Sequence, residues 1–280
     1  MGRRCIGLDA HRDFAQVAVW EDGKVRQAGQ IAMTAEALRI FADSLCPEDE
    51  VAIEATCNTH AIVLAPSTPQ EMLDLTRLAF ELSFRYRNPV VVVADGYLGQ
   101  MTGKVVLPAT AIQPGLPDWA VFGDGAHRGN LISSIYLDER DLEKHNERLN
   151  EKYRRMEAEE RSDAFSCSDA TTLVVAFGTP ARMAKGAVEA LRREGVNAGL
   201  FRPLTLWPFP IAALKAFLPH VKRILVVEAS NGQLEDELRL ALSKAGLTQP
   251  PIENVRHAGG ILPQAAEIAA AVRASEEVLA

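Results

Sequence analysis

Four consecutive valines occupy positions 90–93, between Pro89 and Gly96. An apolar run that turn residues bound on both sides predicts a strand buried on both faces. Such strands occur mainly in α/β folds, where ligands bind at the carboxyl ends of the strands. The loop after this strand is therefore a candidate binding or docking site, and its candidate residues are Asp95, Gly99, Gln100 and Met101.

A helix is expected directly before this strand, over 69–86. Apolar residues recur there at helical spacing, and Thr68 and Pro69 supply an N-cap followed by a proline in the first turn. A short apolar run at 63–65 precedes the helix. Strand, helix and strand in this order predict a β-α-β unit.

Two segments of different character follow. The stretch 102–136 is rich in glycine and has no clear periodicity, so it is expected to be a long irregular loop. Its His127 and Arg128 either meet an anionic substrate or form an ordinary surface pair. The stretch 138–161 carries acidic and basic residues in parallel rows at helical spacing, which predicts an exposed helix that joins two domains, followed by a linker at 162–168.

The remainder of the chain alternates regularly between strand and helix patterns. Strands are predicted at 171–177, 198–201, 223–228 and 252–256, and helices at 180–194, 211–218, 232–245 and 263–274. Thr179 is the expected cap of the first of these helices. The alternation predicts a parallel sheet with right-handed crossovers. The strand-end loops show no nucleophile–base pair, so a docking face is expected there, with Arg202, Glu228, Asn231 and Gln233 as its candidate residues.

The first 63 residues have a different pattern. Strands are predicted at 5–10, 14–20, 24–33 and 51–55, with a helix at 34–45 before the last of them. This order is the opening of a ribonuclease H-like fold. It places Asp9 and Glu54 at the ends of two strands, where the two carboxylates could hold Mg²⁺ or could simply be solvated turn residues.

Composition narrows the classes of function. Of the 280 residues 48% are hydrophobic, which supports a real core, and the net charge of −7 gives no general attraction to DNA or to an anionic membrane. No apolar segment approaches the length that spans a bilayer. The four cysteines are scattered without a C-x-x-C pair, which disfavours an iron–sulfur or zinc site in this chain and fits a reducing cytoplasm.

Two short stretches of the first segment carry a specific resemblance. The sequences Ile-Gly-Leu-Asp-Ala-His-Arg-Asp at 6–13 and Ile-Glu-Ala-Thr-Cys-Asn-Thr at 53–59 resemble the N-terminal part of DEDD-type insertion-sequence transposases, which have a ribonuclease H-like domain. The resemblance implies that Asp9 and Glu54 are the first two of four metal-binding acids. The other two acids of that family have no counterpart downstream, and Cys57 replaces an expected glycine.

Several independent motifs between 63 and 279 resemble a second family. Residues 64–72, 94–101, 200–209 and 227–234 are similar to the α subunit of 2-oxoacid:ferredoxin oxidoreductases. Within that group, the stretches 102–108 and 127–134 look most like the 2-oxoisovalerate enzymes.

The second resemblance implies a thiamine-diphosphate enzyme that converts a 2-oxoacid to an acyl-CoA and reduces ferredoxin. Thiamine diphosphate would be shared with a β subunit, and iron–sulfur clusters would lie on ferredoxin-like partner subunits. The implied domains are a partial pyrimidine-binding α/β segment at 64–136, the helical linker at 137–169 and a transketolase C-terminal-like domain at 170–280. The glutamate that activates the cofactor precedes this region in the family, so no catalytic residue carries over.

The sequence is thus interpreted as a fusion. A truncated, ribonuclease H-like transposase start at 1–63 is joined to the C-terminal part of an oxidoreductase α subunit, which is expected to hold no cofactor and to be inactive alone. Two other functions remain open: metal-dependent DNA transposition, and a non-catalytic module that docks onto partner subunits.

Overall fold

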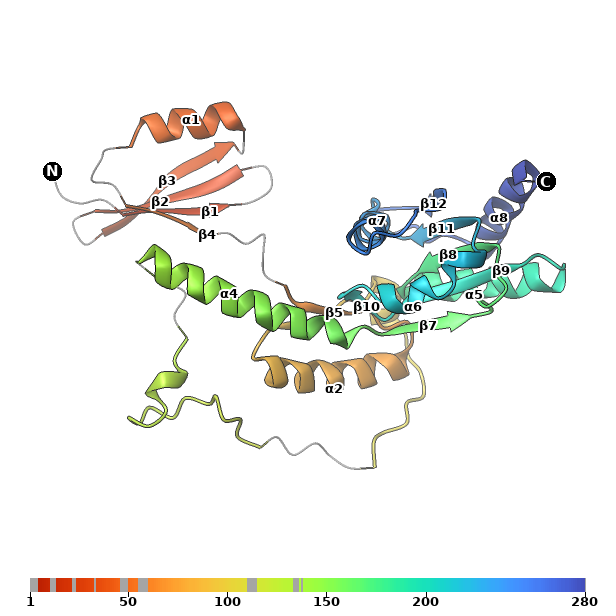
Figure 1. Ribbon diagram of the computed structural model, residues 1–280, viewed down its shortest axis with the longest axis horizontal. Coiled ribbons are helices and arrows are strands. Elements are labelled where there is room, and N and C mark those ends of the chain that lie inside the picture. Colours follow the sequence, from red (N-terminus) through yellow and green to blue (C-terminus); the bar gives the residue numbers. More distant parts are fainter. Residues whose placement is uncertain are drawn as a thin grey trace. The chain divides into compact units, whose positions relative to one another are not determined.

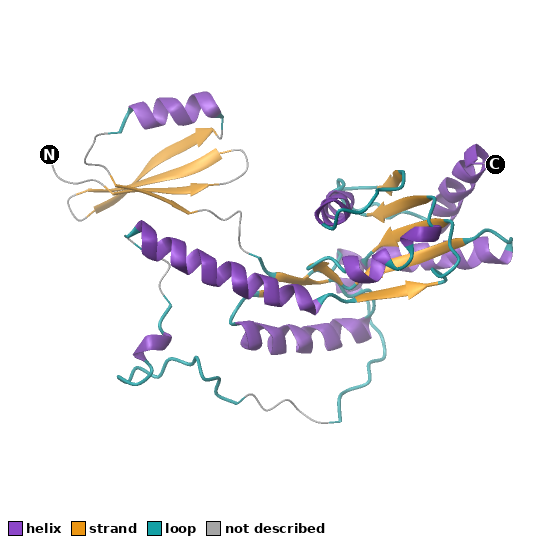
Figure 2. Cartoon of the chain, in the orientation of Figure 1, coloured by secondary structure: helices purple, strands orange, loops and turns teal. Residues whose placement is uncertain are grey.

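A computed structural model describes residues 5–10, 14–21, 24–32, 34–45, 50–54, 60–109, 115–132, 136 and 138–279. The chain divides into two compact units, Met1–His60 and Ala61–Ala280 (Figure 1). Each unit is described by itself below. Both units combine helices and strands, so the fold is α/β (Figure 2).

The first unit is a four-stranded sheet with one helix. Its elements are β1 (Cys5–Ala10), β2 (Phe14–Glu21), β3 (Lys24–Ala32), α1 (Ala35–Asp43) and β4 (Glu50–Glu54). The strand order is β3-β2-β1-β4, with an antiparallel meander from β1 to β3 and with β4 parallel to β1. Val17 and Val19 are buried beneath Ile31, Phe41 and Leu45. The predicted order of strands and helix is confirmed.

The second unit begins with a small three-stranded sheet. Its strands are β5 (Ile62–Leu64), β6 (Val90–Val92) and β10 (Thr205–Trp207), in the order β10-β5-β6. Strands β5 and β6 are parallel and flank α2 (Pro69–Tyr86), which confirms the predicted β-α-β unit and the Thr68 cap. Two helices contribute to the core of this sheet, α2 and α4 (Glu139–Met156), whose Met156 is fully buried.

The valine strand is less buried than predicted. Val90 and Val92 pack into this core, but Val91 remains 43% exposed and Val93 36% exposed. Alternate residues of a strand face opposite sides, so one face is covered and the other is open. The prediction of burial on both faces is wrong because only the face that carries Val90 and Val92 packs against the core cluster.

A larger sheet forms the rest of the second unit. Its strands are β7 (Ser162–Phe165), β8 (Thr172–Ala176), β9 (Ala198–Pro203), β11 (Arg223–Glu228) and β12 (Ile252–Arg256), in the order β12-β11-β8-β9-β7. All neighbours are parallel except β7, which is antiparallel to β9. Its helices are α5 (Gly178–Arg193), α6 (Ile211–Lys215), α7 (Gln233–Lys244) and α8 (Ala265–Leu279).

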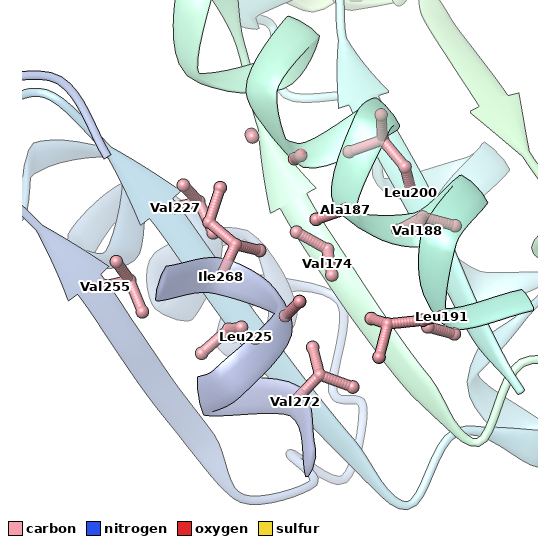
Figure 3. Packing of buried hydrophobic residues seen from close by; sticks show 14 of the residues in the cluster. Val174, Ala187, Val188, Leu191, Leu200, Leu225, Val227, Val255, Ile268 and Val272 are labelled. Atoms are coloured by element: carbon pink, nitrogen blue, oxygen red, sulfur yellow. The ribbon is translucent and has the colours of Figure 1, made fainter. Parts of the chain in front are cut away.

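Helices cover both faces of this sheet. On one face, α5 and α8 bury a continuous apolar cluster with Val174, Leu200 and Leu225 from three neighbouring strands (Figure 3). On the other face, residues of α6 and α7 pack on Leu173, Phe201 and Val226. The predicted alternation of strands and helices in this region is confirmed. Burial on both faces explains why these strands are continuous apolar runs.

Three details differ from the sequence predictions. The predicted linker 162–168 contains strand β7, a polar edge strand whose short sequence lacks apolar alternation. Thr179 does not cap α5, which starts at Gly178 with Phe177 as N-cap, because Gly178 takes a φ of +60° and turns the chain one residue earlier. The spacing of Leu142, Leu149, Tyr153 and Met156 predicts a narrow apolar seam along α4, but Leu142 is 40% exposed.

The remaining short elements are α3 (Gly96–Gln100), η2 (Arg128–Asn130), η3 (Glu157–Glu159) and η4 (Leu218–His220). Within the described ranges, no helix is long and apolar enough to cross a membrane.

Candidate functional site

Three of the candidate residues lie at carboxyl ends of parallel strands of the second unit. Asp95 follows β6, Arg202 is near the end of β9, and Glu228 ends β11. Asp95 thus belongs to the small sheet, whereas Arg202 and Glu228 belong to the large sheet. In each sheet the residue lies at the carboxyl end of a strand, which is where α/β folds place their sites.

Asp95 connects the starts of two helices. Its Oδ1 accepts a hydrogen bond of 2.8 Å from the backbone N–H of Leu98 and caps α3. Its carboxylate also accepts the backbone N–H and the hydroxyl of Thr179, each at 2.9 Å, in the first turn of α5. Gly178 permits this approach, because a Cβ there would lie 3.1 Å from Oδ2 of Asp95. Asp95 therefore supplies the cap that α5 does not provide for itself.

This environment keeps Asp95 ionised. Burial alone would raise the pKa of the Asp95 carboxyl, but hydrogen bonds from Leu98 and Thr179 outweigh it and lower the pKa. A carboxylate held in this way is an acceptor, and it is a poor source or store of protons near neutral pH.

Arg202 forms the second connection, with Glu71 in the first turn of α2. Nη1 and Nη2 of Arg202 donate to the two oxygens of Glu71 at 2.8 and 2.7 Å, and Nη2 also reaches Asp163 at 3.2 Å. Ser67 completes the group, since its backbone N–H and hydroxyl donate to Glu71 at 2.8 and 2.9 Å. A bidentate guanidinium–carboxylate pair fixes both distance and orientation.

Glu71 is also held as an anion. Burial would raise the pKa of the Glu71 carboxyl, but the hydrogen bond and charge of Arg202 and the hydrogen bonds from Ser67 lower it overall. Glu71 and Asp95 are thus both committed to partners within the chain.

The loop at 99–101 approaches the second helix turn of α5. Gly99 and Gln100 are exposed at the end of α3, and Met101 is half-buried. The Nη1 group of Arg182 on α5 lies 3.2 Å from the Met101 sulfur. This loop therefore lies beside Arg182 on α5.

Glu228 is a buried residue that caps a helix. The side chain is fully buried and its carboxylate accepts the Ser230 hydroxyl and the backbone N–H of Leu234, the latter at 3.0 Å. It thereby caps α7, whose own N-cap is a glycine. Asn231 and Gln233 are exposed beside it, so they remain available to a partner.

Asp9 and Glu54 lie opposite each other in the first unit. Strands β1 and β4 are parallel neighbours, and their register pairs Asp9 with Glu54. The two strands are thus neighbours in the backbone pairing. The metal role of the two residues stays a prediction.

His127 and Arg128 lie in the irregular stretch after α3. The Nδ1 atom of His127 is 2.7 Å from Oδ1 of Asp124, so the imidazole has a partner within its own loop. Two interactions anchor the loop to the end of α2: Trp119 donates to the Phe84 carbonyl at 2.9 Å, and the Arg87 guanidinium lies 5.0 Å above the Trp119 ring. The surface-pair alternative fits this arrangement better than substrate binding.

The site residues that sequence reasoning did not single out are Glu71 and Ser67, and Thr179 was expected only as a helix cap. Glu71 stands three residues after the N-cap Thr68, the spacing at which a first-turn acid commonly bonds back to the preceding backbone. That spacing could have indicated a capping role. The contact with Arg202, 131 residues away, has no local signal.

Asp95 and Glu71 do not fit an activating role toward a thiamine cofactor. Such a role needs a carboxyl group free to hydrogen-bond the cofactor, and both Asp95 and Glu71 already have two or more partners. Among the described residues, no group of three His, Cys, Asp or Glu side chains could hold a metal ion. We therefore derive no catalytic step through the cofactor from these residues.

Comparisons with known families show which proteins the chain is similar to. Residues 30–162 match the family described as pyruvate flavodoxin/ferredoxin oxidoreductase, thiamine diphosphate-binding, and residues 170–268 match pyruvate:ferredoxin oxidoreductase core domain II. These regions relate the chain to the α subunit of 2-oxoacid:ferredoxin oxidoreductases. The first match begins within the segment compared above with transposases, and the comparisons give no support to that resemblance.

Individual relatives are more specific. The chain is 45% identical over 187 residues to the ketoisovalerate oxidoreductase subunit VorB of Methanothermobacter thermautotrophicus, covering 66% of this chain and 53% of the relative. It is 39% identical over 219 residues to VorB of Methanothermobacter marburgensis, covering 77% and 60%. The chain thus spans a little over half the length of these relatives.

A solved structure supports the fold. The 2-oxoglutarate:ferredoxin oxidoreductase from Magnetococcus marinus, with 2-oxoglutarate, coenzyme A and succinyl-CoA bound, matches with a TM-score of 0.57 and 20% identity, over 78% of this chain and 42% of that one. At this identity the likeness concerns the α/β fold alone.

Proposed function

We propose that this chain corresponds to part of a subunit of a 2-oxoacid:ferredoxin oxidoreductase of the 2-oxoisovalerate type, and that it docks onto partner subunits without supporting turnover itself. The observation that carries the proposal is the 45% identity to a ketoisovalerate oxidoreductase subunit over 187 residues. The family reaction is the oxidative decarboxylation of a 2-oxoacid to an acyl-CoA, with reduction of ferredoxin. The decarboxylating chemistry would come from thiamine diphosphate shared with a β subunit.

Within such a complex, the role proposed for this chain is to dock and to position. Asp95 bonds to Thr179, and Arg202 bonds to Glu71, so that these contacts tie the small sheet and α2 to the large sheet. The carboxylates of Asp95 and Glu71 are both engaged in these contacts, so neither is free for acid–base chemistry. Electron transfer to ferredoxin would use iron–sulfur clusters of the ferredoxin-like partner subunits.

An activity assay tests the proposed division of labour. The purified chain is incubated with 2-oxoisovalerate, coenzyme A, thiamine diphosphate, Mg²⁺ and oxidised ferredoxin, first alone and then with the β and ferredoxin-like subunits of a ketoisovalerate oxidoreductase. We expect no substrate-dependent ferredoxin reduction in either case. Turnover comparable to that of the intact complex would contradict the proposed docking role.

A second candidate function rests on the register of Asp9 with Glu54. Two adjacent carboxylates could bind Mg²⁺ and act on a phosphodiester. Mg²⁺-dependent cleavage of DNA that Asp9→Asn abolishes would favour this function. If no cleavage is observed, this second candidate is rejected and the oxidoreductase proposal remains.

A further inference from the structure

A pocket of about 590 Å³ lies in the second unit. It is bounded by α5, by the β7–β9 edge of the large sheet and by the chain that leads into α2. Pockets of this size accommodate small ligands. Its largest contribution comes from one face of α5, through Arg182, Lys185, Gly186 and Glu189.

Two cations on that face have no fixed counter-charge. Arg182 and Lys185 are both exposed and stand three residues apart, one above the other on the helix. Arg182 donates to a methionine sulfur, which is a weak acceptor, and the Lys185 ammonium lies 5.1 Å above the Phe165 ring. In the described part of the chain, neither forms an ion pair.

The other charges of the pocket are arranged differently. Glu71 and Asp163 both contact the guanidinium of Arg202, at 2.7 and 3.2 Å, and so belong to a fixed network. Glu189 lies one turn beyond Lys185 and is exposed. Arg182 and Lys185 are therefore the groups best placed to take a new anionic partner.

Gly186 leaves the backbone of α5 open to the pocket. It occupies the interior of α5, where glycine is less favourable than alanine. A Cβ built on Gly186 would meet no atom within 4 Å, and Gly186 lines the pocket. A ligand in the pocket therefore has access to the helix backbone at this position.

We propose that this pocket binds a small anionic ligand through a phosphate or carboxylate group. Arg182 and Lys185 hold the anionic group, and the body of the ligand lies against the helix at Gly186. The proposal goes beyond the oxidoreductase function and does not rest on it.

Titration of the full chain with inorganic phosphate and with acetate, at ionic strength kept constant with chloride, tests the site. We expect saturable binding of at least one probe, with an apparent Kd raised about tenfold or more in the Arg182→Gln, Lys185→Gln double variant. The double variant Arg193→Gln, Lys215→Gln removes the same charge outside the pocket and is expected to bind like the wild type. Binding of phosphate alone indicates a phosphate ester, and binding of acetate indicates a carboxylate.

Gly186→Leu tests the close approach separately. Leucine favours helix and meets open space here, so the melting temperature should stay equal or rise while the affinity for the probe falls about tenfold or more. The proposal is overturned if neither probe binds saturably, if the two charge variants bind equally, or if Gly186→Leu leaves the affinity unchanged.

Discussion

Glu71 and Arg202 join residues that are 131 positions apart in the sequence. Their side chains are only 27% and 11% exposed, and two parallel hydrogen bonds connect them. Loss of the carboxylate would leave the Ser67 donors without their acceptor and would leave the guanidinium only Ser67 Oγ and Asp163 as partners. The pair therefore matters to stability more than an exposed ion pair would.

Glu71→Gln should lower the free energy of unfolding by about 1–3 kcal/mol. The reason is the loss of charge-assisted hydrogen bonds from a largely buried arginine. Urea unfolding monitored by circular dichroism measures the change. Glu143→Gln, at an exposed position of α4, serves as the matched control and should change stability by less than about 0.5 kcal/mol. Equal effects of the two variants would show that the Glu71–Arg202 pair does not stabilise the fold.

Acid should weaken the same contacts. The pKa values of Glu71 and Asp95 are lowered from ordinary values of 4.5 and 3.8. A group with a lowered pKa in the folded state binds fewer protons than in the unfolded state, so its contribution is present above the ordinary pKa and is lost as the pH falls through the folded pKa. The double variant Glu71→Gln, Asp95→Asn should therefore lose less stability than the wild type between about pH 5 and pH 3. A wild-type curve as flat as that of the variant would contradict the assignment.

At the scale of elements, the small sheet β10-β5-β6 has one covered and one open face. Ile62 of β5 is fully buried, and Val91 of β6 is 43% exposed. The open face and the free edge of β6 are where further structure could be added.

Truncation at these two positions should have unequal effects. Ile62→Ala should lower the free energy of unfolding by about 2–4 kcal/mol, because it removes buried methyl groups and leaves a cavity. Val91→Ala should lower it by less than about 1 kcal/mol, since the side chain is already partly in water. Chemical denaturation of both variants gives the comparison, and a large loss at Val91 would show that the face is covered.

The turn between β11 and α7 contains a buried capping residue, Glu228, and an exposed residue, Asn231. Glu228→Ala should lower the free energy of unfolding by about 1–3 kcal/mol, because Leu234 loses its acceptor in a buried place. Asn231→Ala is the neighbouring control and should be close to neutral, as Asn231 is exposed. Thermal melting of the two variants distinguishes the residues, and similar melting temperatures would contradict the capping role of Glu228.

Most helices and strands were predictable from the sequence, but which elements and side chains pack against one another was not. Helix α2 followed from the Thr68–Pro69 start, and the strands of the large sheet followed from their apolar runs, because these signals are local. Strand β7 was missed because its four residues, Ser162–Phe165, are mostly polar. The exposure of Val91 depends on whether another element packs on that face of β6, and the Glu71–Arg202 contact depends on tertiary packing. Sequence periodicity carries neither kind of information.

At the scale of the whole molecule, the second unit is held together across its two sheets. Strand β10 follows β9 of the large sheet in the chain, yet it pairs with β5 of the small sheet. Asp95 and Arg202 add two further connections between the same regions. The matches at 30–162 and 170–268 relate most of the chain to one class of oxidoreductase subunit. The central property proposed for this chain is therefore assembly with partner subunits.

Binding to a partner tests that property most directly. The full chain is titrated by calorimetry with the thiamine diphosphate-binding β subunit of a ketoisovalerate oxidoreductase. We predict a one-to-one complex with a Kd of about 1 μM or lower, the range of a specific interface. The variant with Val91→Lys and Val93→Lys should bind about tenfold or more weakly at unchanged stability, because both valines lie exposed beside the free edge of β6. The absence of any complex at about 50 μM of each protein would contradict the assignment of this chain as an oxidoreductase subunit.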